Sequence, residues 1–167
     1  MRSAQIFHAP VSSTVPAVFA LSMVLLLSGC MTGMAPSGGG GLAPGLTARI
    51  DSPSSQMDRG AALSLVNAYR ATRGTSALLA DPALDAQAAQ VASQYARSGT
   101  PPSVPQGARA MRLSAGYETF AETFSGWRNS PADADVLALS SARRAGLAVV
   151  YDQTSAYGTH WVLVLGE

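Results

Sequence analysis

Residues 115–131 read Ala-Gly-Tyr-Glu-Thr-Phe-Ala-Glu-Thr-Phe-Ser-Gly-Trp-Arg-Asn-Ser-Pro, and this stretch indicates the fold more strongly than any other in the chain. Thr119 and Glu122 have the spacing of a capping box. In that motif the Thr hydroxyl accepts from the Glu backbone N–H, and the Glu carboxylate accepts from the Thr N–H. Ser130 precedes Pro131 and is therefore pushed out of the α region, which ends a helix. The pattern predicts a short helix that begins after Thr119.

Three aromatic side chains lie at helical spacing in this segment, namely Phe120, Phe124 and Trp127. They form one apolar stripe that must be buried against another element. Together with Tyr151 and Trp161 they have two possible uses, the lining of an apolar ligand pocket or the packing of the core. Core packing is the more frequent use of such a stripe, and we expect these residues to form much of the core.

Two further helices are expected between Asp58 and the loop at 98–107. Asp58 suits the N-cap of the first helix, and Gly74 ends that helix in the C′ position. The second helix begins at Asp81 as N-cap, with Pro82 at the first helical position, where a missing N–H costs nothing. Its alanine-rich sequence favours helix and allows neighbouring elements to approach closely.

Two strands are predicted near the C-terminal end, at residues 145–151 and 159–165. Both runs are largely apolar and contain β-branched residues, and residues 152–158 between them form a hairpin loop. Strands with so little polar alternation are typical of a sheet that is covered on both faces, and we expect helices on each side.

Three motifs together resemble the CAP superfamily of cysteine-rich secretory, antigen 5 and pathogenesis-related 1 proteins, also called SCP domains. They are Asn-x-Tyr-Arg at 67–70, Leu-x-x-Asp-x-x-Leu at 78–84 before the alanine-rich helix, and Gly-Trp-Arg-Asn-Ser-Pro at 126–131. The resemblance extends over about residues 61–165. It implies an α+β fold over residues 57–167, a three-layer α-β-α sandwich with a small antiparallel sheet.

The resemblance also implies a cleft that has lost most of the family's site. In the family two histidines and two glutamates line the cleft, and in some members they bind a divalent cation. The corresponding positions here are Met111, Glu122 and Asp133, and the short loop at 98–107 contains no histidine. We expect these three residues to line a degenerate ligand cleft without a metal ion, with Glu122 acting mainly as the capping-box acid. A cluster of Glu122, Asp133 and Asp135 is an alternative, although three monodentate carboxylates leave most Ca²⁺ positions to water.

Other catalytic groups are scarce, since the chain has two histidines, His8 in the N-terminal segment and His160 in the last strand. A metal site needs several ligands that converge on one point, so we expect neither a metal nor a cofactor. Nucleophilic catalysis needs a hydroxyl beside a base, and His160 is the one candidate base. We favour a packed or solvent-facing histidine. A residual hydrolase would require Glu122 and His160 to approach each other across the cleft.

The N-terminal segment resembles a bacterial lipoprotein signal peptide. Residues 15–27 are mostly apolar but too few to span a bilayer comfortably. They lead into Leu27-Ser28-Gly29-Cys30, which resembles the lipobox, whose cysteine is lipidated and becomes the new N-terminus. Cys30 is the sole cysteine, so a disulfide framework is not expected. We predict a signal peptide over 1–29 and lipidation at Cys30; an ordinary secretory signal with a chance cysteine is the alternative.

A flexible tether is predicted over residues 30–56. This segment contains Ser37-Gly38-Gly39-Gly40-Gly41 and repeated prolines, with little apolar periodicity. Such a composition buries too little surface to offset the entropy of ordering. Met31 follows the cysteine in place of an aspartate, which in enterobacterial lipoproteins favours the outer membrane. We therefore expect a domain that faces the periplasm.

The charge balance argues against nucleic acid as a partner. Removal of the signal peptide takes away one of 11 basic residues, all of them arginine, and leaves ten against 10 acidic residues. A near-neutral domain has no electrostatic footprint for a polyanion. The sequence predicts a lipid-anchored, monomeric envelope protein, a non-enzymatic binding or interaction module whose partners are the membrane and a lipid or other envelope component. The alternatives are a residual envelope hydrolase and a binder of lipids or sterol-like molecules in an apolar cavity.

Overall fold

The computed structural model describes residues 41–167. The predicted signal peptide over 1–29, His8, Cys30 and the first part of the predicted tether lie outside the described residues. Within residues 41–167, no helix has the length and apolar character that crossing a bilayer requires.

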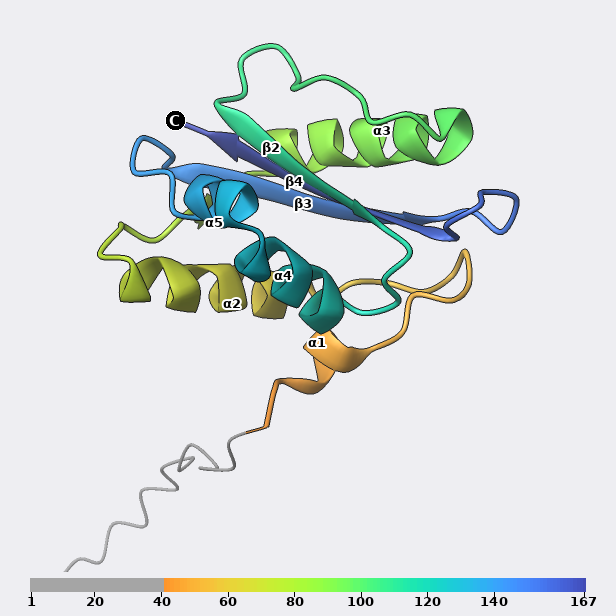
Figure 1. Ribbon diagram of the computed structural model, residues 1–167, viewed down its shortest axis with the longest axis horizontal. Coiled ribbons are helices and arrows are strands. Elements are labelled where there is room, and N and C mark those ends of the chain that lie inside the picture. Colours follow the sequence, from red (N-terminus) through yellow and green to blue (C-terminus); the bar gives the residue numbers. More distant parts are fainter. Residues whose placement is uncertain (1–40) are drawn as a thin grey trace, which may run out of the picture. The chain divides into compact units, whose positions relative to one another are not determined.

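The fold is α+β and alternates helices with the strands of one mixed sheet (Figure 1). The strand order is β1-β3-β4-β2. The two predicted strands are present as the antiparallel pair β3 and β4. Two strands that were not predicted complete the sheet: β2 pairs antiparallel with β4, and the edge strand β1 pairs parallel with β3. The elements are α1 Pro44–Thr47, α2 Arg59–Thr72, β1 Leu79–Ala80, α3 Pro82–Ser98, β2 Ala110–Ala115, α4 Phe120–Asn129, α5 Pro131–Leu137, β3 Arg144–Tyr151 and β4 Thr159–Gly166.

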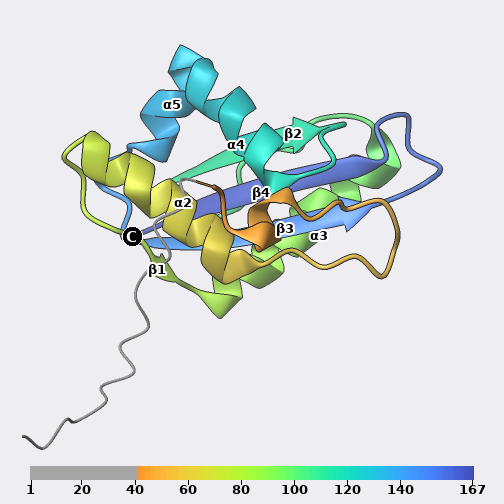
Figure 2. The ribbon, with the colours of Figure 1, turned by 90° about the horizontal axis from the view of Figure 1, so that it is seen from below.

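The sheet is the middle of three layers. Helix α3 covers one face alone, and α2, α4 and α5 cover the other (Figures 1 and 2). All of β4 is buried, because it lies between two strands and under helices on both sides. The three-layer arrangement expected from the sequence is therefore present.

Helices α2 and α3 begin where the sequence predicts. The Asp58 carboxylate accepts from the Ala61 N–H at 2.9 Å at the start of α2. The Asp81 carboxylate accepts from the first amides of α3, and Pro82 follows it. Gly74, just after α2, has a φ of 69°, a left-handed conformation that favours glycine. These local contacts fix the ends of the helices before any tertiary packing is considered.

The two faces of the sheet pack differently. The face under α3 is built mainly from small and aliphatic side chains, namely Leu84, Ala88, Val91, Ala92, Met111, Ala148, Val162 and Val164. The opposite face is built around aromatic side chains, with Phe120, Phe124, Trp127 and Trp161 in one cluster. The interpretation of these four aromatic residues as core is confirmed, since each is at most 5% exposed.

The α3 layer lies close to the sheet backbone. A Cβ atom added to Gly146 of β3 would lie 2.0 Å from the main-chain carbon of Leu84 in α3. No side chain fits into that space. The strand therefore requires glycine here for close approach, and α3 rests directly on main chain at this point.

Beyond the short strand β1, two side chains close the outer edge of β3. The Leu147 N–H donates to the Asp85 carboxylate at 2.8 Å, and the Leu147 carbonyl accepts from the Arg59 Nε at 2.9 Å. Asp85 comes from α3 and Arg59 from α2, so each helical layer contributes one group to the same edge residue.

The Asn-x-Tyr-Arg motif explains how α2 is joined to the rest of the fold. Asn67 forms two hydrogen bonds with the main chain of Leu78, at 3.0 and 2.8 Å. Arg70 is fully buried, and its guanidinium donates to main-chain carbonyls only. The acceptors are Ser76 at 2.8 Å, Leu137 at 2.7 Å, Leu139 at 3.2 Å and Ala142 at 3.3 Å.

The predicted tether differs from the structure in the part that the structure describes. Leu46 is 4% exposed and Ile50 is 2% exposed, and both belong to the aromatic core cluster. The Ile50 N–H also donates to the Glu118 carbonyl at 2.8 Å. Two isolated apolar residues in a segment rich in Gly, Pro and Ser show no periodicity, so the sequence pattern does not reveal that they join the aromatic core.

Candidate functional site

Glu122 is used by the helix that contains it. Its carboxylate accepts from the Thr119 N–H at 3.1 Å, and its own N–H donates to the Thr119 hydroxyl at 3.2 Å. Both halves of the predicted capping box are present. One carboxylate oxygen thus stabilises the start of α4, which supports the interpretation of Glu122 as mainly a capping acid.

The predicted cleft residues do not converge on one point. Met111 is buried against α3, on the opposite face of the sheet from α4 and α5. Its neighbour Arg112 points the other way, and its Nε lies 3.3 Å from the Asp133 carboxylate of α5. The grouping of Met111 with Glu122 and Asp133 is therefore corrected. Both faces of β2 are covered, so alternation along this strand does not indicate which residues face which layer.

The acidic residues that follow α4 belong to a helix of their own. Asp133 and Asp135 both lie inside α5, which starts at Pro131. Asp133 pairs with Arg112, and Asp135 lies 3.8 Å from Arg73. Among residues 41–167, no three His, Cys, Asp or Glu side chains are grouped as a metal site requires.

His160 lies on the α3 side of the sheet and is fully buried. Its ring meets that of Tyr95 edge to face, with the centroids 4.9 Å apart. Its Nε2 lies 3.1 Å from the Ser155 hydroxyl, in the β3–β4 hairpin. Burial lowers the pKa of His160, and the Asp152 charge and the Gly158 carbonyl partly oppose this shift.

Glu122 and His160 are not brought together. Glu122 belongs to α4 on one face of the sheet, and His160 packs against Tyr95 of α3 on the other. The residual hydrolase built on these two residues has no geometric support. Sequence reasoning missed Ser155 as the neighbour of His160. The available signal was a serine five residues before a strand histidine across a predicted hairpin loop.

A groove lies between α2 and α4 on the aromatic side of the sheet. One part has a volume of about 400 Å³ and continues into a second of about 360 Å³, since both share Leu65, Phe124 and Arg128. The first part is completed by Leu42, Ala121, Glu122 and Ser125, and the second by Ala68, Tyr69 and Thr72. The floor and walls are mostly apolar, with charges at the rim.

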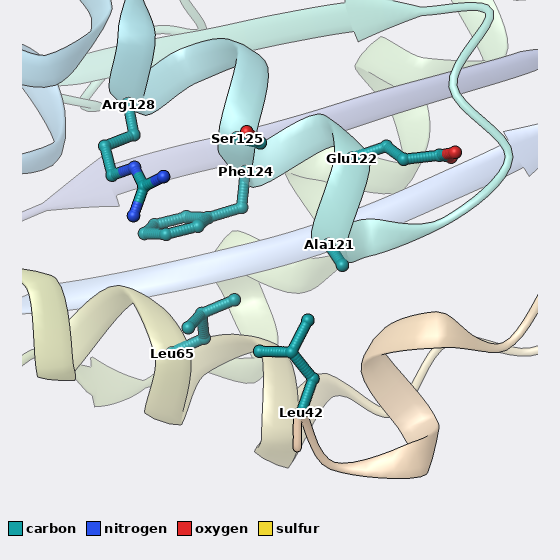
Figure 3. Close-up of a pocket in the computed structure, with 7 residues that line it drawn as sticks. All are labelled: Leu42, Leu65, Ala121, Glu122, Phe124, Ser125 and Arg128. Carbon is teal, nitrogen blue, oxygen red and sulfur yellow. The ribbon is translucent and has the colours of Figure 1, made fainter. Parts of the chain in front are cut away.

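The side chains in the groove divide by polarity. Figure 3 shows Leu42 and Leu65 facing Phe124 across the groove, while the Glu122 carboxylate points away from both leucines. Arg128 extends from α4 at the end of the first part away from Glu122, where the second part begins (Figure 3). Leu42 is 53% exposed although it lies in an apolar wall. The groove thus offers an elongated, mostly apolar floor with a cationic side chain where its two parts meet.

The family description "CAP: Cysteine-rich secretory protein family" matches residues 63–165 of the chain. No curated protein sequence matches it. The family match covers most of α2 and every later element of the fold.

Solved structures with the same fold include bacterial surface and extracellular proteins. An outer surface protein from Borrelia burgdorferi is 18% identical, with a TM-score of 0.56, over 66% of this chain and 92% of that chain. MpPR-1i is 22% identical, with a TM-score of 0.54, over 64% of this chain and 88% of that chain. An extracellular protein with an SCP domain from Bacillus anthracis is 15% identical, with a TM-score of 0.53, over 64% of this chain but 39% of that longer chain. At these identities the likeness concerns the fold.

Proposed function

Because the chain belongs to the cysteine-rich secretory protein (CAP) family, we propose that it is a binding module of the bacterial cell envelope that takes an apolar chain into the α2–α4 groove. The observation that carries this proposal is the continuous groove along Leu65 and Phe124, with Arg128 where its two parts meet. A mostly apolar, elongated hollow with one cationic side chain on its wall fits an acyl chain that carries an anionic or polar head group.

Chemistry at the family's cleft is not part of the proposal. The Glu122 carboxylate is engaged by the main chain of Thr119. The Asp133 carboxylate faces Arg112, so an internal counter-charge occupies the place where a cation would need free carboxylates. Binding in the groove needs neither group, since the Glu122 carboxylate points away from the groove's apolar floor (Figure 3).

The proposal includes a lipid anchor at Cys30, with a cleaved signal peptide over 1–29 and the domain facing the periplasm from the outer membrane. The sequence Leu27-Ser28-Gly29-Cys30 supports it. Stable anchoring takes more than one acyl chain, as a lipidated N-terminal cysteine provides. Cys30→Ser should move the full chain from the membrane fraction to the soluble fraction, with loss of the acyl mass. Retention in the membrane without acylation would contradict the anchor.

The groove is tested with the full chain in detergent and a fluorescent fatty acid as probe. Ala121→Trp adds an indole to the groove wall beside Leu65 and should weaken binding at least about tenfold, because the added ring fills space that the acyl chain needs. The matched control is Ala86→Trp, the same exchange on the exposed side of α3.

The control decides between specific and general binding. Wild-type and Ala86→Trp proteins should bind the probe equally. Equal loss in both variants, or equal binding by all three proteins, would overturn the groove as the site. Arg128→Gln should weaken the binding of the anionic probe more than the binding of a neutral long-chain alcohol, because the Arg128 charge attracts the carboxylate.

A further inference from the structure

The β3–β4 hairpin places a hydroxyl against the ring of the buried histidine. Ser155 Oγ lies 3.1 Å from His160 Nε2. His160 is fully buried, whereas Ser155 is half-buried and therefore partly open to solvent. This pair lies on the α3 side of the sheet, away from the α2–α4 groove, and nothing in the proposed binding function uses it.

The hydrogen bond between the two side chains decides what the pair can do. Either atom can be the donor, because the roles depend on the tautomer of the ring. His160 Nδ1 is buried and has no hydrogen-bond partner among the described residues. In the tautomer with the proton on Nδ1, Nε2 accepts from the Ser155 O–H, and in this form the ring can act as a base.

The charge state of the ring fits a base. Burial lowers the pKa of His160, so the neutral imidazole persists at neutral pH. The titratable groups that face it are Tyr95 from α3, Tyr157 from the hairpin with ring centroids 6.3 Å apart, and Asp152 at the end of β3. None of them is a cation that would compete with proton uptake.

A main-chain contact also holds the Ser155 hydroxyl in place. The Tyr157 N–H donates to Ser155 Oγ at 3.4 Å, and the Ser155 N–H donates to the Asp152 carbonyl at 3.1 Å. The neighbouring Thr154 lines a groove of about 390 Å³ together with Asp152, Ser93 and Arg97. A small substrate in this groove would lie next to the residue that precedes the serine.

We propose that Ser155 is a nucleophile that accepts an acyl group from a small carboxylic ester, with His160 as the general base. The Ser155 O–H proton moves to Nε2 while Oγ bonds to the ester carbon. The bond to the alcohol oxygen then breaks, and the departing alkoxide takes the proton from Nε2. Water then hydrolyses the acyl-serine by the reverse sequence. A water molecule gives a proton to Nε2 while its oxygen bonds to the acyl carbon. The bond between Oγ and the acyl carbon breaks, Oγ recovers the proton from Nε2, and the carboxylic acid is released.

The test treats the full chain in detergent with a fluorophosphonate probe and measures intact mass, followed by peptide mapping. One adduct is expected, on Ser155, with fluoride as the leaving group. General-base assistance is worth about 10²–10⁴-fold, so the folded Ser155→Ala variant should label at least about 100-fold more slowly. Ser64→Ala, which removes an exposed hydroxyl of α2 on the other face of the sheet, should label at the wild-type rate. Adducts that persist in Ser155→Ala, or no adduct in the folded wild type, would overturn the proposal.

The pH profile separates an activated serine from a merely structural one. The labelling rate of the wild type should stay level through neutral pH and fall only below the ordinary histidine range of about 6.5, since protonated Nε2 cannot accept the proton. His160→Gln should remove that dependence together with most of the labelling. A rate that instead rises with hydroxide concentration throughout would mean that His160 plays no part, and the proposal would fail even if the groove binds its probe.

Discussion

The two faces of the sheet are covered by helices that pack through side chains of different size. Under α3, small residues such as Ala88 and Ala92 allow a helix to rest on the backbone of β3 at Gly146. On the other face, aromatic side chains from α4 pack with Trp161 of the sheet in one core cluster under three helices. The first face is closed at Gly146 and has grooves beside the C-terminal part of α3 and its neighbouring loops, and the second has a groove between α2 and α4.

The difference shows how residue size decides where a small domain has room for a ligand. Alanine and glycine contribute little volume, so backbones approach until no space remains. Large rings fill the centre of an interface well, but they leave hollows at its margin when two helices diverge around them. The closed face supplies stability, and the open face supplies the surface on which we place the binding function.

The largest expected effect comes from forcing the closed face apart. Gly146→Ala places a methyl group 2.0 Å from the Leu84 main-chain carbon, where neither backbone has a flexible part to move. We expect a loss of about 3 kcal/mol in the free energy of unfolding, at the upper end of the range for overpacking. Urea denaturation measures it. Gly41→Ala, with no atom within 4 Å of the added carbon, is the control and should be neutral. Equal stability of the two variants would mean that α3 is not in tight contact with β3.

A smaller loss should follow from loosening the open face at Arg70. Arg70→Lys keeps the positive charge but replaces a planar fork of five donors by a single ammonium group. Of the four carbonyls that Arg70 now binds, most would lose their partner while still buried, so we expect a loss of about 2 kcal/mol. Thermal unfolding with and without the fatty acid probe would show whether the groove loosens as well. A fully stable Arg70→Lys protein would show that the fork geometry is dispensable.

The smallest expected effect concerns the cap of α4, the helix that walls the groove. Thr119→Ala removes the hydroxyl that accepts from Glu122 and should cost about 1 kcal/mol. Glu122→Gln should cost only a few tenths of that amount, because glutamine also closes a capping box. Both variants should bind the probe like the wild type. If Glu122→Gln alone altered probe binding, the carboxylate would have a role beyond the cap.

Local chemistry made much of the fold predictable. The caps at Asp58, Asp81 and Thr119 act within three residues of chain, so their sequence patterns carry nearly all the information. The aromatic stripe on α4 was predictable because its period matches one face of a helix. The motif at 67–70 could be quoted from the sequence, but its physical meaning could not. Arg70 reaches carbonyls as far as Ala142, which only the tertiary fold brings close.

The candidate site was less predictable because it depends on which side of the sheet a residue faces. Met111 and Arg112 differ by one position, and this places one against α3 and the other against Asp133. Ser155 and His160 meet through the hairpin geometry, which neither residue encodes alone. Leu46 and Ile50 are buried although they lie in a segment whose composition is typical of a tether.

The closed edge at Leu147 affects how the protein behaves at high concentration, where copies of the chain meet. An exposed strand edge is a template on which another chain can add a strand. At Leu147 both main-chain groups are already bonded to the side chains of Asp85 and Arg59. A second molecule would have to break two hydrogen bonds before it could add to this edge. The two hydrogen bonds at Leu147 therefore oppose the strand addition from which fibres grow along this side of the sheet.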